Sequence, residues 1–268
     1  MTTLSAQPAL VDVSRPRRIG FTVLAALLAL FTGVAMGGIP ALVQTFTVTG
    51  HDVVHQIHYI HWAAFMGVLV AVPLTALAFR PTVAAAQHAA VVVVAFVAAA
   101  AVAQMFDPAI IIFPVLIGLL LWLHPRRGEL FRAGEGFSAQ LGLLAAAVTI
   151  PSLWYGWSEI QVHLAAPLSD PHRGPPEAHY VSSAALVFAV IGAAWLASTR
   201  TTGWRLPAWC AGLAMGMTGA ASIWLPGWVS SFDRVWGTAA LVWGIAFVAV
   251  AEWLHRRAVA AAEGPARP

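Results

Sequence analysis

The chain has 268 residues, of which 60% are hydrophobic and only 9% are charged. Soluble domains carry about 25% charged residues, so this composition excludes an ordinary soluble protein with a water-facing surface. All 14 basic residues are arginine, and the absence of lysine excludes a retinal protein, which needs a lysine for its Schiff base.

Apolar runs of about 20 residues recur along the chain and predict an all-α, polytopic integral membrane protein with eight transmembrane helices. The expected spans are 19–46, 57–79, 82–106, 109–124, 137–157, 180–198, 206–224 and 235–254. We therefore expect a cytoplasmic N-terminal tail over 1–18, an eight-helix membrane domain over 19–255 and a cytoplasmic C-terminal tail over 256–268.

The arginines predict the orientation of these spans. An even number of spans puts both termini on one side, and twelve of the fourteen arginines fall there; only Arg173 and Arg234 fall on the other side. Arginine-rich loops face the cytoplasm, so both termini are predicted to be cytoplasmic. We expect a multi-pass protein of a bacterial cell (plasma) membrane, with the lipid bilayer as its main partner. A membrane protein partner or a homo-oligomer is compatible with this, and the arginines require no nucleic acid.

Histidine is concentrated on the predicted outer face. The stretch "GHDVVHQIHYIHWAAF", which opens the second span, holds four histidines at 51, 55, 58 and 61. On a helix, residues 51, 55 and 58 fall within about 60° of one another, and His61 lies about 60° further round. His163 and His179 belong to the long outer loop 158–178 or to its junction with the sixth span.

These residues predict an outward-facing site rich in histidine and acidic groups, whose core ligands are His55, His58 and His179. The alternates are His51, His61 and His163, and Asp52, Glu159 and Glu177 are the acidic residues placed to orient the rings. His172 lies in the turn-like stretch "SDPHRGPPEAHY", so we expect it to be solvated. For His88 and His124, on the cytoplasmic side, we expect a packed or interfacial role.

Imidazole combined with carboxylate suits copper(II), iron or zinc, whereas the single Cys210 disfavours a thiolate site. Alternatively, His58 and His179 could be the two axial ligands of a haem. Metal binding requires neutral imidazole, so it should weaken as the pH falls below about 6.5.

A short similarity suggests an internal repeat. "HYIHWAAF" opens the second span at His58, and "HYVSSAALVF" opens the sixth at His179, 121 residues later. The arginines that close these spans, Arg80 and Arg200, are 120 residues apart. This spacing fits a 4+4 parallel repeat, in which His58 and His179 are equivalent positions.

We interpret the sequence as a membrane protein that binds a metal ion or haem at its outer face, with a redox-related role. One alternative is a transporter or channel with a histidine-lined outer vestibule, for which the small residues of "AGLAMGMTGAAS" in the seventh span could line a path. Another is a membrane scaffold or assembly protein without cofactor. The sequence indicates no catalytic residue and does not decide whether the protein is an enzyme.

Overall fold

The computed structural model describes residues 14–49, 55–132, 134, 136–170, 172–173 and 178–263. This part of the chain is helical and contains no strand, which confirms the all-α prediction. The helices are α1 (Arg15–Leu30), η1 (Phe31–Ala35), α2 (Gly38–Thr47), α3 (Gln56–Trp62), η3 (Ala63–Ala71), α4 (Val72–Phe79), α5 (Val83–Val102), α6 (Ala109–Leu123), η4 (Arg127–Glu129), α7 (Ala139–Ala165), α8 (His179–Ser198), α9 (Arg205–Trp224) and α10 (Asp233–Glu263).

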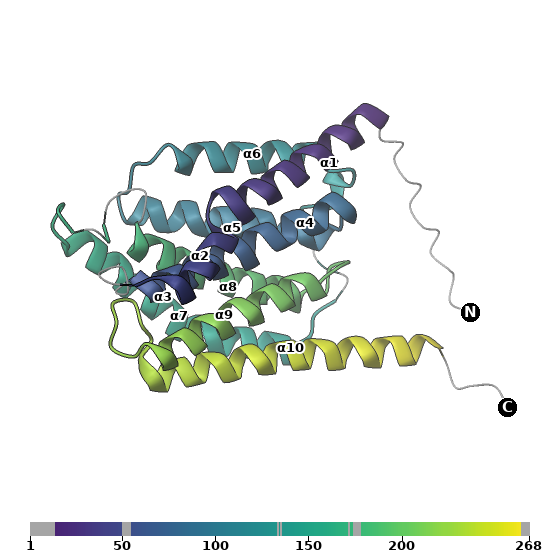
Figure 1. Cartoon of the computed structure of the whole chain (residues 1–268). Helices are drawn as coiled ribbons and strands as arrows, with labels where there is room; N and C mark the ends of the chain where they lie inside the picture. The colour runs from purple at the N-terminus through teal and green to yellow at the C-terminus, as the bar shows by residue number, and fades with distance from the viewer. Residues whose placement is uncertain are drawn as a thin grey trace.

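These helices lie roughly side by side in one bundle, with α8 near its centre and α10 along one flank (Figure 1). Of the helices, α8 is among the most deeply buried because α5, α7 and α9 all pack against it. The start of α1 and the end of α10 lie at the same end of the bundle (Figure 1). We call this the arginine end, and the opposite end, where α3 and α8 begin, the histidine end.

Six stretches in the described residues are long and apolar enough to cross a membrane, which indicates a multi-pass membrane protein. They are Arg15–Thr47, Gln56–Phe79, Val83–Val102, His179–Ser198, Arg205–Trp224 and Asp233–Glu263. The apolar α6 is shorter, and the long α7 is not among the six. The count of eight spans therefore stays a prediction.

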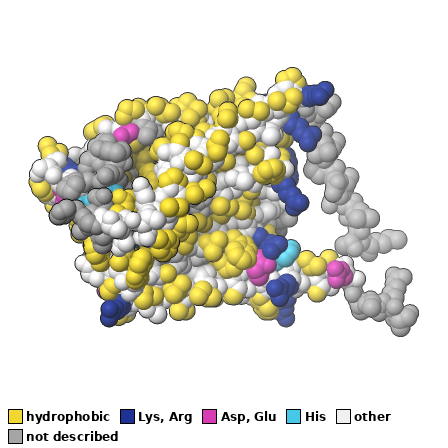
Figure 2. Space-filling model, in the orientation of Figure 1, with side chains coloured by type: hydrophobic (Ala, Val, Ile, Leu, Met, Phe, Trp, Pro, Cys, Tyr) yellow, Lys and Arg dark blue, Asp and Glu magenta, His cyan; other side chains and the backbone are white. Residues whose placement is uncertain are grey.

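The bundle has an apolar flank and a charged end. In the visible face of Figure 2, hydrophobic atoms cover the flank and most arginine groups gather at the arginine end. There the Arg17 guanidinium donates hydrogen bonds to the backbone oxygens of Trp122, Leu123 and His124. A cation at the last carbonyl groups of α6 satisfies acceptors that the helix leaves free.

The first span departs from the expected continuous helix. The π-helical segment η1 and Gly37, with a φ of 88°, separate α1 from α2. A positive φ favours glycine, so the sequence allows the chain to bend here. The Trp62 indole donates a 2.5 Å hydrogen bond to the Met36 carbonyl oxygen, which lies in the bend.

Helices α9 and α10 are packed closely enough for their backbones to touch. A Cβ atom added to Gly219 would lie 2.5 Å from the backbone nitrogen of Leu241, and one added to Gly244 would lie 2.4 Å from the Gly212 carbonyl oxygen. Small residues allow this approach in membrane helices. The small residues of the seventh span, α9, therefore serve close packing against α10 along this face.

Two helices extend beyond the predicted membrane spans. Helix α7 continues to Ala165, past the expected end at residue 157, and thereby includes Glu159 and His163 as helical residues. Helix α10 continues to Glu263, past residue 254. In both cases the hydrophobic run ends before the helix does, because polar residues such as Glu159 continue the helix beyond the apolar segment.

Candidate metal site

Four histidine rings meet at the histidine end of the bundle. They are His55 and His58 at the start of α3, His172 in the connection between α7 and α8, and His179, the first residue of α8. The distances between their ring centroids range from 4.2 Å, for His58 and His179, to 6.1 Å, for His55 and His58. We call these four residues the histidine quartet.

Three members of the quartet have the geometry of a metal site. One ligand atom each from His55, His58 and His179 lies within 4.8 Å of the other two, so these residues could hold a metal ion. Zinc–nitrogen bonds of about 2.0–2.1 Å place two ligand nitrogens at most about 4 Å apart, so small ring movements suffice. The three residues are those that the sequence predicts as core ligands, and the structure brings them together.

Local sequence explains why the three rings converge. His55 and His58 are three residues apart, so the first turn of α3 projects both to one side. Ala178, immediately before α8, has a φ of 31°, and this left-handed residue turns the chain into the helix at His179. The His179 amide also donates a 3.0 Å hydrogen bond to the His172 carbonyl oxygen, which fixes the loop against the helix start.

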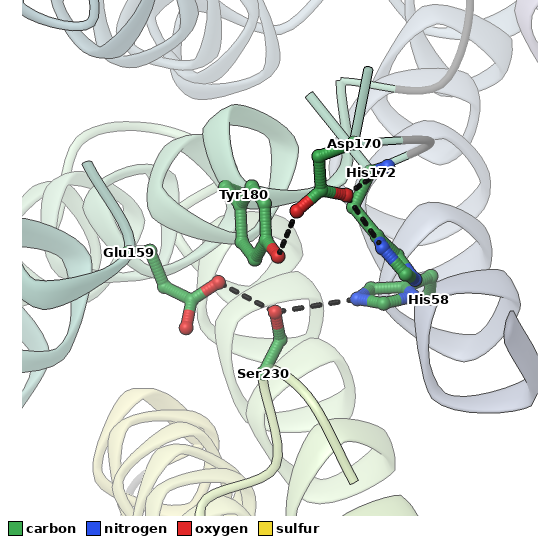
Figure 3. A network of polar contacts seen from close by, with 6 residues as sticks. All are labelled: His58, Glu159, Asp170, His172, Tyr180 and Ser230. Atoms are coloured by element: carbon green, nitrogen blue, oxygen red, sulfur yellow. Dashed lines mark hydrogen bonds and ion pairs between the residues drawn. The ribbon is translucent and has the colours of Figure 1, made fainter. Parts of the chain in front are cut away.

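His172 was predicted to be solvated, and this prediction was wrong. Its ring centroid lies 4.9 Å from that of His55, 5.1 Å from that of His58 and 5.6 Å from that of His179. The Asp170 carboxylate holds it in place by accepting hydrogen bonds from its backbone amide, at 2.8 Å, and from its Nδ1, at 3.0 Å (Figure 3). With Nδ1 donating, the lone pair is on Nε2, the form in which a carboxylate-oriented histidine binds metal.

The Asp170 carboxyl is suited to this role. Burial acts to raise its pKa, but the hydrogen bonds from the His172 backbone and ring outweigh burial and hold this pKa below its ordinary value. The Tyr180 hydroxyl group lies 3.5 Å from the second carboxylate oxygen, on the first turn of α8 (Figure 3). Asp170 therefore stays ionised at neutral pH and accepts hydrogen bonds both from His172 in the α7–α8 connection and from Tyr180 on α8.

A second carboxylate reaches the quartet through a serine. The Ser230 hydroxyl donates a 2.6 Å hydrogen bond to Glu159 Oε2, and its oxygen lies 3.3 Å from His58 Nε2 (Figure 3). Because the single hydroxyl proton is directed at Glu159, the contact with His58 requires Nε2–H to donate. This leaves the lone pair of His58 on Nδ1, an atom that is buried without a hydrogen-bond partner in the described structure.

Ser230 is held in this position by the backbone. It has a φ of 65°, and its carbonyl oxygen accepts a 2.7 Å hydrogen bond from the Tyr155 hydroxyl. Glu159 and Tyr155 are one turn apart on α7, so one helix binds both sides of the serine. No pattern in the sequence indicates Ser230, because it lies in a short connection and contacts Glu159, 71 residues away along the chain.

The other predicted site residues are placed differently. His61 is buried one turn deeper than His58, and its Nδ1 lies 3.0 Å from the Ser183 hydroxyl on α8. His163 is buried at the end of α7, and no described contact joins it to the quartet. Glu159 acts only through Ser230. His51, Asp52 and Glu177 lie outside the described residues.

The remaining histidines match the packed role expected for them. His88 is buried and lies 2.9 Å from the Leu69 carbonyl oxygen, within the π-helical segment η3. His124 is buried at the arginine end, with its ring edge-on to that of Phe21. Neither belongs to the quartet.

The haem alternative does not fit this arrangement. Two axial histidines hold a haem between them, with the macrocycle separating their rings. The rings of His58 and His179 instead stack on each other, with an angle of 11° between their planes and 4.2 Å between their centroids. That spacing leaves no room for a macrocycle, so the geometry supports a single ion.

Comparison with known proteins gives no relative: no protein-family model matches the sequence, and no curated protein or solved structure is similar to it. The function must therefore be argued from the site.

Proposed function

We propose that this protein is a multi-pass membrane protein that binds one transition metal ion at the quartet, through His55, His58 and His179, with His172 as a fourth nitrogen ligand. The observation that carries the proposal is the convergence of three ligand atoms within 4.8 Å of one another from two helices. A set of neutral imidazoles suits zinc, copper(II) or iron(II).

The unpaired ring nitrogens support a ligand at this point. His55 and His58 each bury an Nδ1 atom without a hydrogen-bond partner in the described structure. A buried polar atom left unpaired costs about 1–3 kcal/mol, and such atoms are few in folded proteins. A bound cation would satisfy both atoms at once, and Asp170 and Glu159 would offset its charge from the surrounding network.

We further infer eight spans, both termini in the cytoplasm and the metal site at the outer face of the plasma membrane. The arrangement that supports this is the separation of the two ends of the bundle, with α1 beginning and α10 ending at the arginine end (Figure 1). The 4+4 parallel repeat and a homo-oligomer or membrane protein partner stay predictions. The starts of α3 and α8, which the repeat would relate, do contact each other.

Of the alternatives, a transporter would need polar groups along a path, and the small residues of α9 instead lie against α10. A scaffold without cofactor would give no reason for the convergence of four histidine rings at one point. The redox-related role stays an expectation from the sequence.

The test is metal content. Full-length protein, purified in detergent and stripped with chelator, is dialysed against zinc, copper(II) or iron(II) and analysed by mass spectrometry of the elements. We expect the wild type to bind about one ion per chain. His58→Ala and His179→Ala should each lower the metal affinity more than 100-fold. His255→Ala, on α10 near the arginine end, is the matched control and should bind normally. Wild-type protein that binds no ion, or variants that bind as wild type, would overturn the proposal.

The orientation has its own test, which the single buried Cys210 makes simple. Leu168 and Phe131 are 87% and 98% exposed, in the connections at the histidine and arginine ends. In intact cells, a membrane-impermeant maleimide should label Leu168→Cys but label Phe131→Cys only after permeabilisation. Equal labelling of both before permeabilisation would contradict the predicted topology.

A further inference from the structure

A cavity of about 310 Å³ lies beside the quartet, between the bend of the first span and helices α3, η3, α5, α6 and α8. Its volume is at the lower end of the roughly 300–1,000 Å³ typical of ligand pockets. Most of its wall is aromatic, aliphatic or thioether, including Phe31, Phe96 and Phe113 and the methionines Met36, Met66 and Met105. Apolar cavities of this kind exclude water and accept apolar molecules.

The two π-helical segments of the described chain both contribute to this wall. η1 supplies Phe31 and Thr32, and η3 supplies Met66. Segments of π-helix occur frequently at functional sites, because the extra residue in the turn redirects side chains.

The cavity borders the surface that faces lipid. Phe31 and Ile112, from the first span and α6, are 49% and 56% exposed while also lining it. The lipid-facing side, where these two residues are exposed, is therefore the side from which we expect a ligand to enter without passing through water.

The few polar lining groups offer acceptors. The Thr32 hydroxyl donates to the Leu28 carbonyl oxygen at 2.8 Å, and the Ser182 hydroxyl donates to the His179 carbonyl oxygen at 2.9 Å. With those protons committed, the two hydroxyl oxygens can take part in further hydrogen bonds only as acceptors, and the third polar lining group, Asp107, is a carboxyl. The polar end of a ligand must therefore donate hydrogen bonds.

We propose that this cavity binds a membrane-borne amphiphile, with one apolar chain among the aromatic and methionine side chains and a hydrogen-bond-donating head group at the acceptors. An isoprenoid quinol and an aminophospholipid share this chemistry. The proposal does not depend on the metal site.

The experiment uses the full-length protein, delipidated in detergent, and two probes, a short-chain quinol and a single-chain phosphatidylethanolamine. Binding is measured by calorimetry, and molecules retained before delipidation are identified by extraction and mass spectrometry. We expect one molecule per chain, and the preferred probe identifies the source as quinol or lipid. Val181→Phe, which fills the wall from α8, should weaken binding at least tenfold.

Val94→Phe is the matched control, because Val94 is 66% exposed on α5 and does not line the cavity. Met105→Trp, at a half-buried position of the wall, provides a second blocking variant that disturbs the core less and decides the question if Val181→Phe does not fold. Binding of neither probe by the wild type, or wild-type binding by a folded blocking variant, would overturn the proposal.

Discussion

The α9–α10 interface and the histidine quartet are both buried contacts between helices, but different forces hold them. At the first, glycines bring backbone against backbone: a Cβ atom added to Gly219 would lie only 2.5 Å from the backbone nitrogen of Leu241. At the second, four polar rings are crowded together while the Nδ1 atoms of His55 and His58 lack partners in the described structure. The first region is close-packed by the protein alone, whereas at the second the proposed metal ion would supply partners that the protein itself does not. The comparison teaches that burial alone does not identify what stabilises the fold.

The largest expected effect is on the glycine interface. Gly219→Ala should destabilise the protein by about 3 kcal/mol or more, because its Cβ would overlap the α10 backbone, which cannot move as a side chain can. Thermal unfolding in detergent measures this. Gly118→Ala, on α6 with nothing within 4 Å of the added Cβ, should leave the melting temperature unchanged or raised. Equal melting temperatures for the two variants would contradict the close packing of α9 and α10.

The next effect should appear only at the quartet. Saturating metal, at about 100 times its dissociation constant, should stabilise the wild type by about 2.7 kcal/mol because the ion binds the folded state. The same addition should leave the melting temperature of His179→Ala unchanged, and it should stabilise Gly219→Ala as much as wild type, since the two regions are separate. Failure of metal to stabilise the wild type would remove the distinction between the regions.

A smaller effect should separate the serine bridge from the ligands. Ser230→Ala should weaken metal binding by about 10–100-fold, because His58 loses the partner that fixes its protonated nitrogen. Glu159→Gln retains an acceptor for the serine hydroxyl and should cost less. Ser158→Ala is the matched control, since its hydroxyl bonds the Tyr155 carbonyl oxygen instead. Measured by competition with a chelator, the metal affinity should be lowest for Ser230→Ala, higher for Glu159→Gln and highest for Ser158→Ala. Equal affinities would exclude an orienting role for Ser230.

The smallest effect concerns pH. Protons compete with metal for imidazole nitrogen, so affinity is highest when the rings are neutral and falls as the pH decreases. Lowering the pH until the rings bind protons should therefore reduce the affinity measurably. The difference in melting temperature between Gly219→Ala and the wild type, both measured without metal, should not change over this pH range. An affinity that rises on acidification would argue against histidine ligands.

The sequence predicted the parts of this molecule that depend on local periodicity. Apolar runs located the helices, and the spacing of His55 and His58, with His179 at the start of another span, indicated which rings could meet. The ring of His172 could not be predicted, because its position depends on Asp170 and on a backbone bond to α8. Ser230 was missed for the same reason: its contact with Glu159 is a tertiary one.

Helix continuity was also beyond the sequence pattern. The break between α1 and α2 lies within a run that is apolar on both sides, and its π-helical turn has no counterpart in hydropathy. What supports the break is the Trp62 indole, which reaches the Met36 carbonyl oxygen from another helix. A pattern read along one span contains no information about such a partner.

That hydrogen bond has a consequence for biosynthesis. A chain made from its N-terminus delivers the first span to the bilayer before Trp62, which follows Met36 by 26 residues. A backbone carbonyl group without a hydrogen-bond donor in lipid costs several kcal/mol. We therefore expect the first span of the nascent chain to insert as an uninterrupted helix and to bend only when α3 packs against it. Hydrogen exchange of the amides around Gly37 should then slow in Trp62→Phe, and unchanged exchange would show that the bend forms unaided. On this view the order of insertion shapes the molecule, because its first helix acquires its final form from a residue that belongs to the next span to enter the bilayer.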